Sequence, residues 1–178
     1  GADTVHPNKE GYLVMSKLVN EAISQSLAQD RNFSELNFYK KDRWVDSKGG
    51  VLNYRYREPE IFEPNKKYPL ILFLHGSGGR GSDNEQQLWD ANAIGAFAKQ
   101  KVSSNFQSYI FAPQVPLNER WVSTEWDTDD YKLLPISSTM RKTFAALDSF
   151  IDNNKHVDTD RVYVLGLSMG GWGTWDAI

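Results

Sequence analysis

The stretch Arg161-Val162-Tyr163-Val164-Leu165-Gly166-Leu167-Ser168-Met169-Gly170 decides the fold expected of this chain. Its apolar and β-branched first half predicts a strand, and the Gly-x-Ser-x-Gly turn that follows predicts a sharp passage into a helix. Such a turn lifts the serine hydroxyl out of the bend, and its glycines avoid collisions with neighbouring backbone. Ser168 is therefore the candidate nucleophile; the alternative is a tight turn with an inert serine.

The elements before this turn alternate between strands and helices. An uninterrupted apolar run at 70–74 predicts a strand buried on both faces, and the run at 109–112 predicts a second strand. Residues 82–85 have the spacing of a capping box and predict the start of a helix, and an apolar period of 3.6 predicts another helix over 136–151. This alternation predicts an α/β fold with a doubly wound, mostly parallel sheet.

The first third of the chain has a different pattern. Apolar residues at helical spacing predict a leading amphipathic helix over 11–28. Two aromatic and β-branched runs, 33–39 and 51–56, flank the turn-forming sequence 46–50. They predict antiparallel strands that precede the parallel sheet.

Composition restricts the classes of function. The 178 residues are 40% hydrophobic and 24% charged, as in a globular domain, and the net charge is −3. Basic residues are scattered, which argues against nucleic-acid and membrane partners. The chain has no cysteine, which excludes disulfides and thiolate chemistry. It has neither a membrane-spanning apolar run nor a signal-peptide pattern. The compartment stays open, and a secreted or periplasmic location is compatible with this composition.

A second glycine-rich segment follows the 70–74 strand. In His75-Gly76-Ser77-Gly78-Gly79 the glycines allow backbone to approach a substrate carbonyl. Together with the residue after the candidate nucleophile, this loop predicts an oxyanion hole formed by the backbone N–H groups of Ser77 and Met169. We expect His75 to hold the loop in place rather than act as the catalytic base.

These segments resemble the α/β-hydrolase superfamily. Within it they are most similar to the phospholipase/carboxylesterase-like esterases, which are related to feruloyl esterases and polyhydroxybutyrate depolymerases. The matching sequences are 74–84, 112–114 with Trp121, and 160–171. The resemblance implies hydrolysis of carboxylic esters through an acyl-enzyme on Ser168, with no cofactor and no metal. It also implies that the triad acid and histidine follow on later strands, beyond Ile178.

The other candidates for a catalytic base or acid fit the chemistry less well. His156 precedes the last strand, where Asn153-Asn154-Lys155 predict a solvated helix end. Asp176 is eight positions beyond Ser168 on the predicted helix, about 12 Å away at 1.5 Å per residue. We expect neither to complete a triad.

The beginning of the chain resembles a different family. Asp3-Thr4-Val5-His6-Pro7-Asn8, followed by Gly11-Tyr12, is similar to the last block of the SGNH (GDSL-type) hydrolases. That resemblance implies that Asp3 and His6 form a catalytic dyad for a serine far upstream; the alternative is a loop before a helix. It divides the chain into residues 1–29, the tail of an SGNH-like domain or a leading helix, and residues 30–178, the first part of an esterase domain.

Three hypotheses for function follow. The first is a serine carboxylesterase, with acetyl or feruloyl esters of plant polysaccharides as the substrates that the resemblance implies. The second is a serine peptidase of the same fold, because the Ser168 turn alone does not separate ester from amide cleavage. The third is a catalytically incomplete fragment or binding module. In each case we expect the remainder of the same protein, or a second chain, to complete the sheet and the triad.

Overall fold

The computed structural model describes residues 36–90, 94–98, 100–125 and 134–178. Within this part of the chain the strands form a five-stranded sheet of order β1-β2-β4-β3-β5. The strands are β1 (Lys40–Val45), β2 (Val51–Arg57), β3 (Tyr68–Leu74), β4 (Tyr109–Pro113) and β5 (Val157–Gly166). The helices are η1 (Leu36–Phe38), η2 (Ser77–Gly79), α2 (Gln86–Trp89), α3 (Gly95–Ala98), α4 (Gln100–Asn105), α5 (Ser138–Asn153) and α6 (Met169–Asp176).

The sheet confirms the predicted fold class. Strand β3 pairs in parallel with β4 on one side and with β5 on the other. Strands β1 and β2 form an antiparallel hairpin that joins the sheet through β4. The hairpin turn is closed by Asp46, whose N–H donates to the carbonyl of Gly50 at 2.8 Å. Gly49 lies in the left-handed region with φ 83°, where glycine is favoured.

The predicted boundaries of the first strand are wrong. The run 33–39 was expected to be extended, but η1 occupies part of it and the strand begins at Lys40. Leu36 and Tyr39 instead pack into the hydrophobic core on the face of the sheet that carries Phe73 and Ile110. Strand β1 is an exposed edge strand with the sequence KKDRWV. Charged residues suit an unpaired sheet edge, so β1 lacks the apolar signal of an interior strand.

The helix after residues 82–85 also differs from the prediction. The capping box does not form: Glu85 is the N-cap of α2 and makes no side-chain cap. Asp83 takes that role, since its Oδ1 accepts from the backbone N–H of Glu85 at 2.9 Å and of Gln86 at 3.1 Å. Within the described residues the region contains three short helices, α2, α3 and α4, instead of one long helix.

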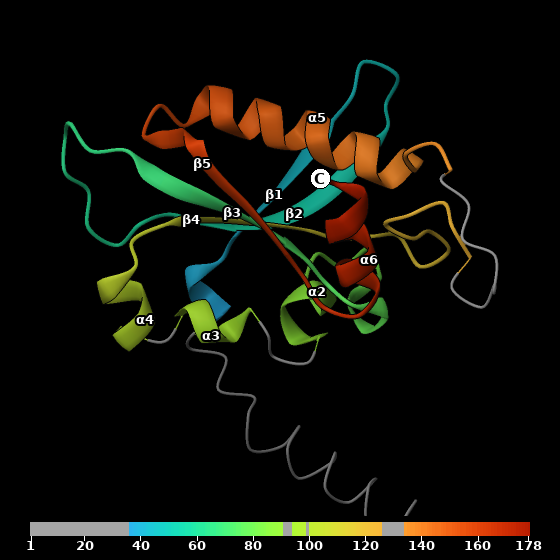
Figure 1. The fold of residues 1–178 in the computed structure, drawn as a ribbon, viewed down its shortest axis with the longest axis horizontal. Coiled ribbons are helices and arrows are strands. Elements are labelled where there is room, and N and C mark those ends of the chain that lie inside the picture. Colours follow the sequence, from blue (N-terminus) through green and yellow to red (C-terminus); the bar gives the residue numbers. More distant parts are fainter. Residues whose placement is uncertain (1–35, 91–93, 99, 126–133) are drawn as a thin grey trace, which may run out of the picture. The chain divides into compact units, whose positions relative to one another are not determined.

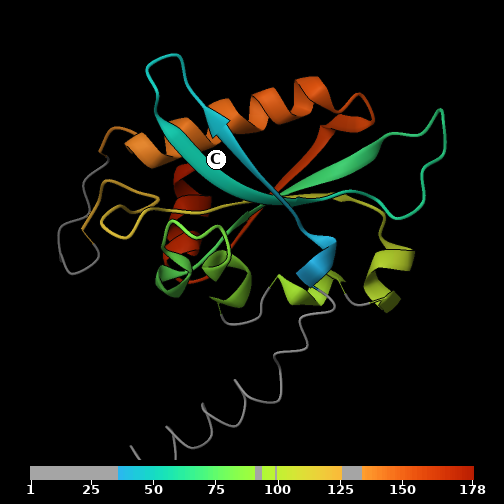
Figure 2. The same ribbon diagram turned by 180° about the vertical axis from the view of Figure 1, so that it is seen from behind.

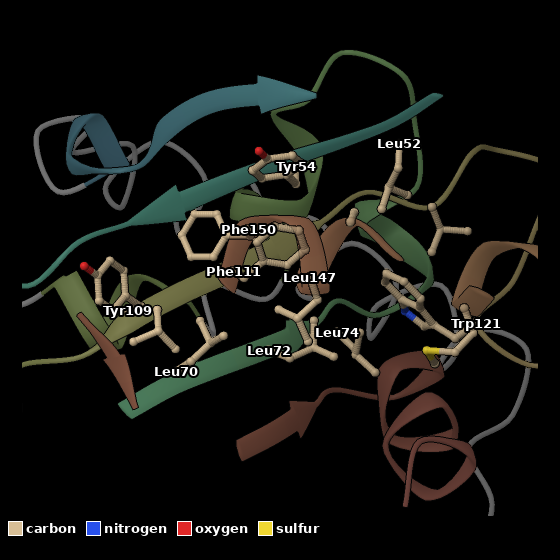
Figure 3. Packing of buried hydrophobic residues seen from close by; sticks show 14 of the residues in the cluster. Leu52, Tyr54, Leu70, Leu72, Leu74, Tyr109, Phe111, Trp121, Leu147 and Phe150 are labelled. Carbon is tan, nitrogen blue, oxygen red and sulfur yellow. The ribbon is translucent and has the colours of Figure 1, made fainter. Parts of the chain in front are cut away.

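Two cores lie on opposite faces of the sheet. On one face Leu70, Leu72 and Leu74 of β3 pack against α5 (Figure 3). On the other face Phe73 and Ile110 pack with residues of η1, α2 and α3. Figure 1 shows α5 on one side of the sheet and the short helices on the other. The alternation of side chains along β3 and β4 thus explains why both strands are apolar throughout.

Strand β5 is the last strand in the sheet order, so its outer edge has no strand partner among the described residues. It lies nearest the viewer in Figure 1, and β1 lies nearest in Figure 2, which shows the sheet from behind. Val162, Tyr163 and Leu165 of β5 are exposed by 37%, 52% and 42%. In the part of the chain that the structure describes, no helix has both the length and the apolar character to cross a bilayer.

Candidate active site

Ser168 lies at the turn between β5 and α6 in a rare backbone conformation. Its φ of 51° and ψ of −113° fall outside the regions that side chains normally allow. The turn is held by the N–H of Gly170, which donates to the carbonyl of Leu167 at 2.7 Å. A conformation of this kind persists only where surrounding contacts enforce it, and it is concentrated at functional sites. The predicted turn is thus present, and it exposes Ser168.

The glycines that flank Ser168 are required by close backbone contacts. A Cβ on Gly166 would lie 1.9 Å from the carbonyl oxygen of Gly170. A Cβ on Gly170 would lie 1.9 Å from the carbonyl oxygen of Leu74, at the end of β3. Both distances are far below van der Waals contact, so neither position accepts a side chain in this geometry.

The loop after β3 is in direct contact with the Ser168 turn. The N–H of Leu167 donates to the carbonyl of Leu74 at 3.1 Å, which joins the ends of the two neighbouring strands. A Cβ on Gly76 would lie 3.4 Å from the Leu167 carbonyl oxygen. The backbone segments that carry Ser77 and Met169 therefore meet at the carboxyl edge of the parallel strands, where ligands bind in sheets of this kind.

His75 is buried and sets the direction of the Ser77 amide. Its Nε2 accepts from the N–H of Val115 at 3.0 Å, so in the neutral ring the proton is on Nδ1. Nδ1 donates to the carbonyl oxygen of Gly76 at 2.5 Å. The N–H of Ser77 belongs to the same trans peptide and points the opposite way, away from the ring. In the described structure neither the Ser77 nor the Met169 N–H donates to a protein group.

Further hydrogen bonds fix the same loop from the β4 side. Trp121 donates through Nε1 to the carbonyl of His75 at 2.8 Å. Gln114 donates through Nε2 to the carbonyl of Gly79 at 3.2 Å and to Oδ1 of Asp83 at 2.7 Å. These contacts explain why the matching sequence 112–114 and Trp121 accompany the glycine-rich loop: they hold its backbone in one conformation.

The burial of His75 has a consequence for acid stability. Desolvation lowers the pKa of His75 from 6.5 to about 4. Between these values the unfolded chain binds more protons than the folded one, so stability falls as the pH falls from 6.5 to 4. The shift corresponds to about 3 kcal/mol of unfolding free energy at 1.36 kcal/mol per unit. We expect urea unfolding at pH 4.5 and 7 to show this loss in the wild type and a smaller loss in His75→Gln. Equal losses in the two proteins would contradict it.

Ser168 also lines a pocket of about 600 Å³, within the range of small-molecule sites. The other lining residues are Val122, Thr124, Gly171, Trp172, Trp175 and Asp176. Asp176 was expected to be too distant for a triad; the structure places it at the end of α6, on the same pocket as Ser168. Its Oδ2 is buried without a hydrogen-bond partner among the described residues, and burial raises its pKa.

His156, the other histidine in the described part of the chain, does not provide a base for Ser168. His156 immediately precedes β5, whereas Ser168 follows the other end of this strand. At about 3.3 Å per residue the strand alone separates them by roughly 30 Å. His156 contacts the carbonyl of Lys66 through Nδ1 at 3.1 Å. Asp3 and His6, the leading helix at 11–28 and the division at residues 29 and 30 involve residues outside the described part, and these stay predictions.

The structure adds a residue that the sequence did not single out. Asp90, at the C-terminal end of α2, places its carboxylate beside Gly76 and Gly78 of the loop. In the sequence it follows Leu88 and Trp89 and has no signal that distinguishes it from a solvent-facing helix residue.

Comparison with known proteins adds to this geometry. No family model matches the chain. A solved thermostable esterase is 31% identical, with a TM-score of 0.70 over 80% of this chain and 37% of that one. A ferulic acid esterase is 24% identical, with a TM-score of 0.51 over 76% of this chain and 52% of that one. Dipeptidyl-peptidase 5 of Arthroderma otae is 28% identical over 131 residues, 72% of this chain and 16% of that protein.

The fold, the strained turn at Ser168 and the likeness to the thermostable esterase agree with one another. The described residues have the fold of an α/β-hydrolase, in part, and resemble the solved thermostable esterase. It spans about a sixth of the length of the curated relative and 37% of the esterase chain. The relatives named include both esterases and peptidases.

Proposed function

We propose that the protein is a serine carboxylesterase whose nucleophile is Ser168. Its Oγ attacks the ester carbonyl carbon while a base takes the hydroxyl proton, and the carbonyl oxygen becomes an oxyanion. The N–H groups of Ser77 and Met169 donate to this oxyanion. Collapse expels the alcohol, which takes up the proton, and leaves an acyl-enzyme. Water then attacks the acyl-enzyme in the same way and releases the acid.

The backbone of Ser168 carries this proposal. Its φ of 51° and the closely packed glycines around it hold a hydroxyl at the edge of the sheet. Next to it lies a loop whose Gly76 carbonyl points to His75. Backbone strain at a serine and a backbone amide without a protein acceptor both cost free energy. A turn with a purely structural role would not be expected to combine them.

The proposed acid and base come from polypeptide outside residues 1–178, either the remainder of the same protein or a second chain. The positions of the two described histidines support this proposal. Both ring nitrogens of His75 are already hydrogen-bonded, Nε2 to Val115 and Nδ1 to Gly76, and His156 lies at the far end of β5 from Ser168. The outer edge of β5, which has no strand partner in the described part of the chain, and its exposed apolar side chains provide a surface on which further strands can pair.

The pocket supports an ester whose acyl or alcohol part carries a ring. Trp172 and Trp175 line it beside Ser168, and aromatic side chains of this kind stack on aromatic acids and on sugars. Acetyl or feruloyl esters of plant polysaccharides are the proposed substrates. The named peptidase relative supports the alternative of a serine peptidase, which shares the same nucleophile.

Comparing an ester with its matching anilide separates these two activities. We expect the full-length protein to hydrolyse p-nitrophenyl acetate with kcat/KM at least about 100-fold above that for p-nitroacetanilide, because p-nitrophenolate leaves as a stable anion whereas an anilide nitrogen must be protonated as it leaves. Dipeptidyl p-nitroanilides serve as the peptidase arm of the assay. Faster turnover of a dipeptidyl anilide than of any ester tested would favour the peptidase.

A further inference from the structure

The Asp90 carboxylate is packed against the backbone of the 75–79 loop. A Cβ on Gly76 would lie 2.6 Å from its Oδ2, and a Cβ on Gly78 would lie 2.6 Å from its Oδ1. Both oxygens therefore occupy space that side chains at 76 and 78 would otherwise fill. Within 4 Å of the Cβ position at Gly78, the described structure places only atoms of Asp90, leaving aside the residues that adjoin Gly78.

The carboxylate makes this contact at an energetic cost. Its Oδ2 is buried and has no hydrogen-bond partner among the described residues. Burial raises the pKa of the Asp90 carboxyl; the nearby backbone N–H of Gly76 lowers it by a smaller amount, without the geometry of a hydrogen bond to Oδ2. A buried oxygen without a hydrogen-bond partner lowers the stability of the folded chain. A helix-end residue that served only solubility would place this group in water.

The loop is thus held at two places. His75 binds the Gly76 carbonyl through Nδ1, and Asp90 contacts the Gly76 and Gly78 backbone. We infer that Asp90 is a positioning residue: it fixes the Gly76–Ser77 peptide so that the Ser77 N–H faces the carbonyl oxygen of a bound ester. This inference rests on the proposed function, because it assigns Asp90 a role through the Ser77 amide.

A double-mutant cycle between Asp90 and Gly78 tests the contact. In the full-length protein, Asp90→Ala leaves the loop without this support, and Gly78→Ala puts a methyl group where Oδ1 lies. We expect each to lower kcat for p-nitrophenyl acetate about tenfold, with KM within twofold, because an oxyanion donor acts in the transition state. In the double variant the methyl group has room, so kcat should stay within threefold of Asp90→Ala alone.

Two further variants separate positioning from folding. Asp90→Asn keeps the shape and an acceptor oxygen, and we expect its kcat to stay within threefold of the wild type. Asp152→Ala, an exposed position on α5, is the matched control and should be unchanged. Rates are normalised to the concentration of nucleophile titrated with a fluorophosphonate, so that a partly unfolded variant is not counted as a slow one.

Several results would overturn the inference. These are a wild-type kcat in Asp90→Ala, losses that multiply in the double variant, a change in KM that matches the change in kcat, or Asp90→Asn as slow as Asp90→Ala. If wild-type turnover depends on Ser168 and Asp90→Ala is unaffected, only the role of Asp90 fails. If Ser168→Ala retains turnover, the proposed function fails with it.

Discussion

Replacing Ser168 with alanine in the full-length protein is expected to lower kcat for p-nitrophenyl acetate by at least about 10⁴-fold. Removal of the nucleophile from a serine triad abolishes the acyl-enzyme route and leaves only the contribution of binding and the oxyanion hole. The substitution removes one oxygen from an exposed side chain, so the free energy of unfolding should change by less than about 0.5 kcal/mol. Stopped-flow or plate-reader release of p-nitrophenol measures the rate.

The control is Ser104→Ala, at an exposed position on α4. It should keep the wild-type rate and the wild-type urea midpoint. Turnover by Ser168→Ala within tenfold of the wild type would mean that another residue supplies the nucleophile.

Gly170→Ala is expected to have the largest effect on stability. The added Cβ would lie 1.9 Å from the Leu74 carbonyl oxygen, 2.5 Å from the Leu74 carbonyl carbon and 2.9 Å from the His75 carbonyl oxygen. All three atoms are backbone, which cannot move aside as a flexible side chain can. Overpacking costs about 1 to 3 kcal/mol when side chains can adjust, so we expect a loss of at least about 3 kcal/mol here. Ester turnover should be lost with it, because β3 and the Ser168 turn separate.

Gly171→Ala provides a matched comparison one residue further along α6. Among the residues that the structure describes, its Cβ would meet only the carbonyl oxygen of Gly166, at 3.9 Å, which is an ordinary contact. Alanine also favours the helix over glycine by up to about 1 kcal/mol, so Gly171→Ala should be as stable as the wild type or more stable. Urea unfolding followed by tryptophan fluorescence measures both variants. Equal midpoints for Gly170→Ala and Gly171→Ala would contradict the packing described for the turn.

The parts of the fold that the sequence predicted are those with local and repetitive signals. Strands β3 and β4 are apolar throughout because both of their faces are covered. A continuous apolar run is the sequence signal of such a strand. Helix α5 has one apolar face and a serine N-cap, Ser137, whose hydroxyl accepts from the N–H of Met140 at 2.9 Å. The turn at Ser168 follows from its glycines and the preceding strand.

The parts that were missed depend on contacts between distant residues. Strand β1 is charged because it lies at the sheet edge, and its extended shape comes from pairing with β2. Asp83 caps α2 in place of Ser82. Its Oδ1, which accepts from the first backbone N–H groups of the helix, also accepts from Gln114 at the end of β4. The contact of Asp90 with Gly76 and Gly78 joins residues that are separate in sequence, and no local pattern encodes it.

Covalent labelling of Ser168 tests the central claim most directly. The full-length protein is incubated with a fluorophosphonate, and the adduct is located by intact mass and peptide mapping. The structure predicts a single adduct on the peptide that contains Ser168, complete loss of ester turnover on labelling, and no adduct in Ser168→Ala. An adduct on a different serine, or a protein that turns over esters while Ser168 stays unlabelled, would contradict the account.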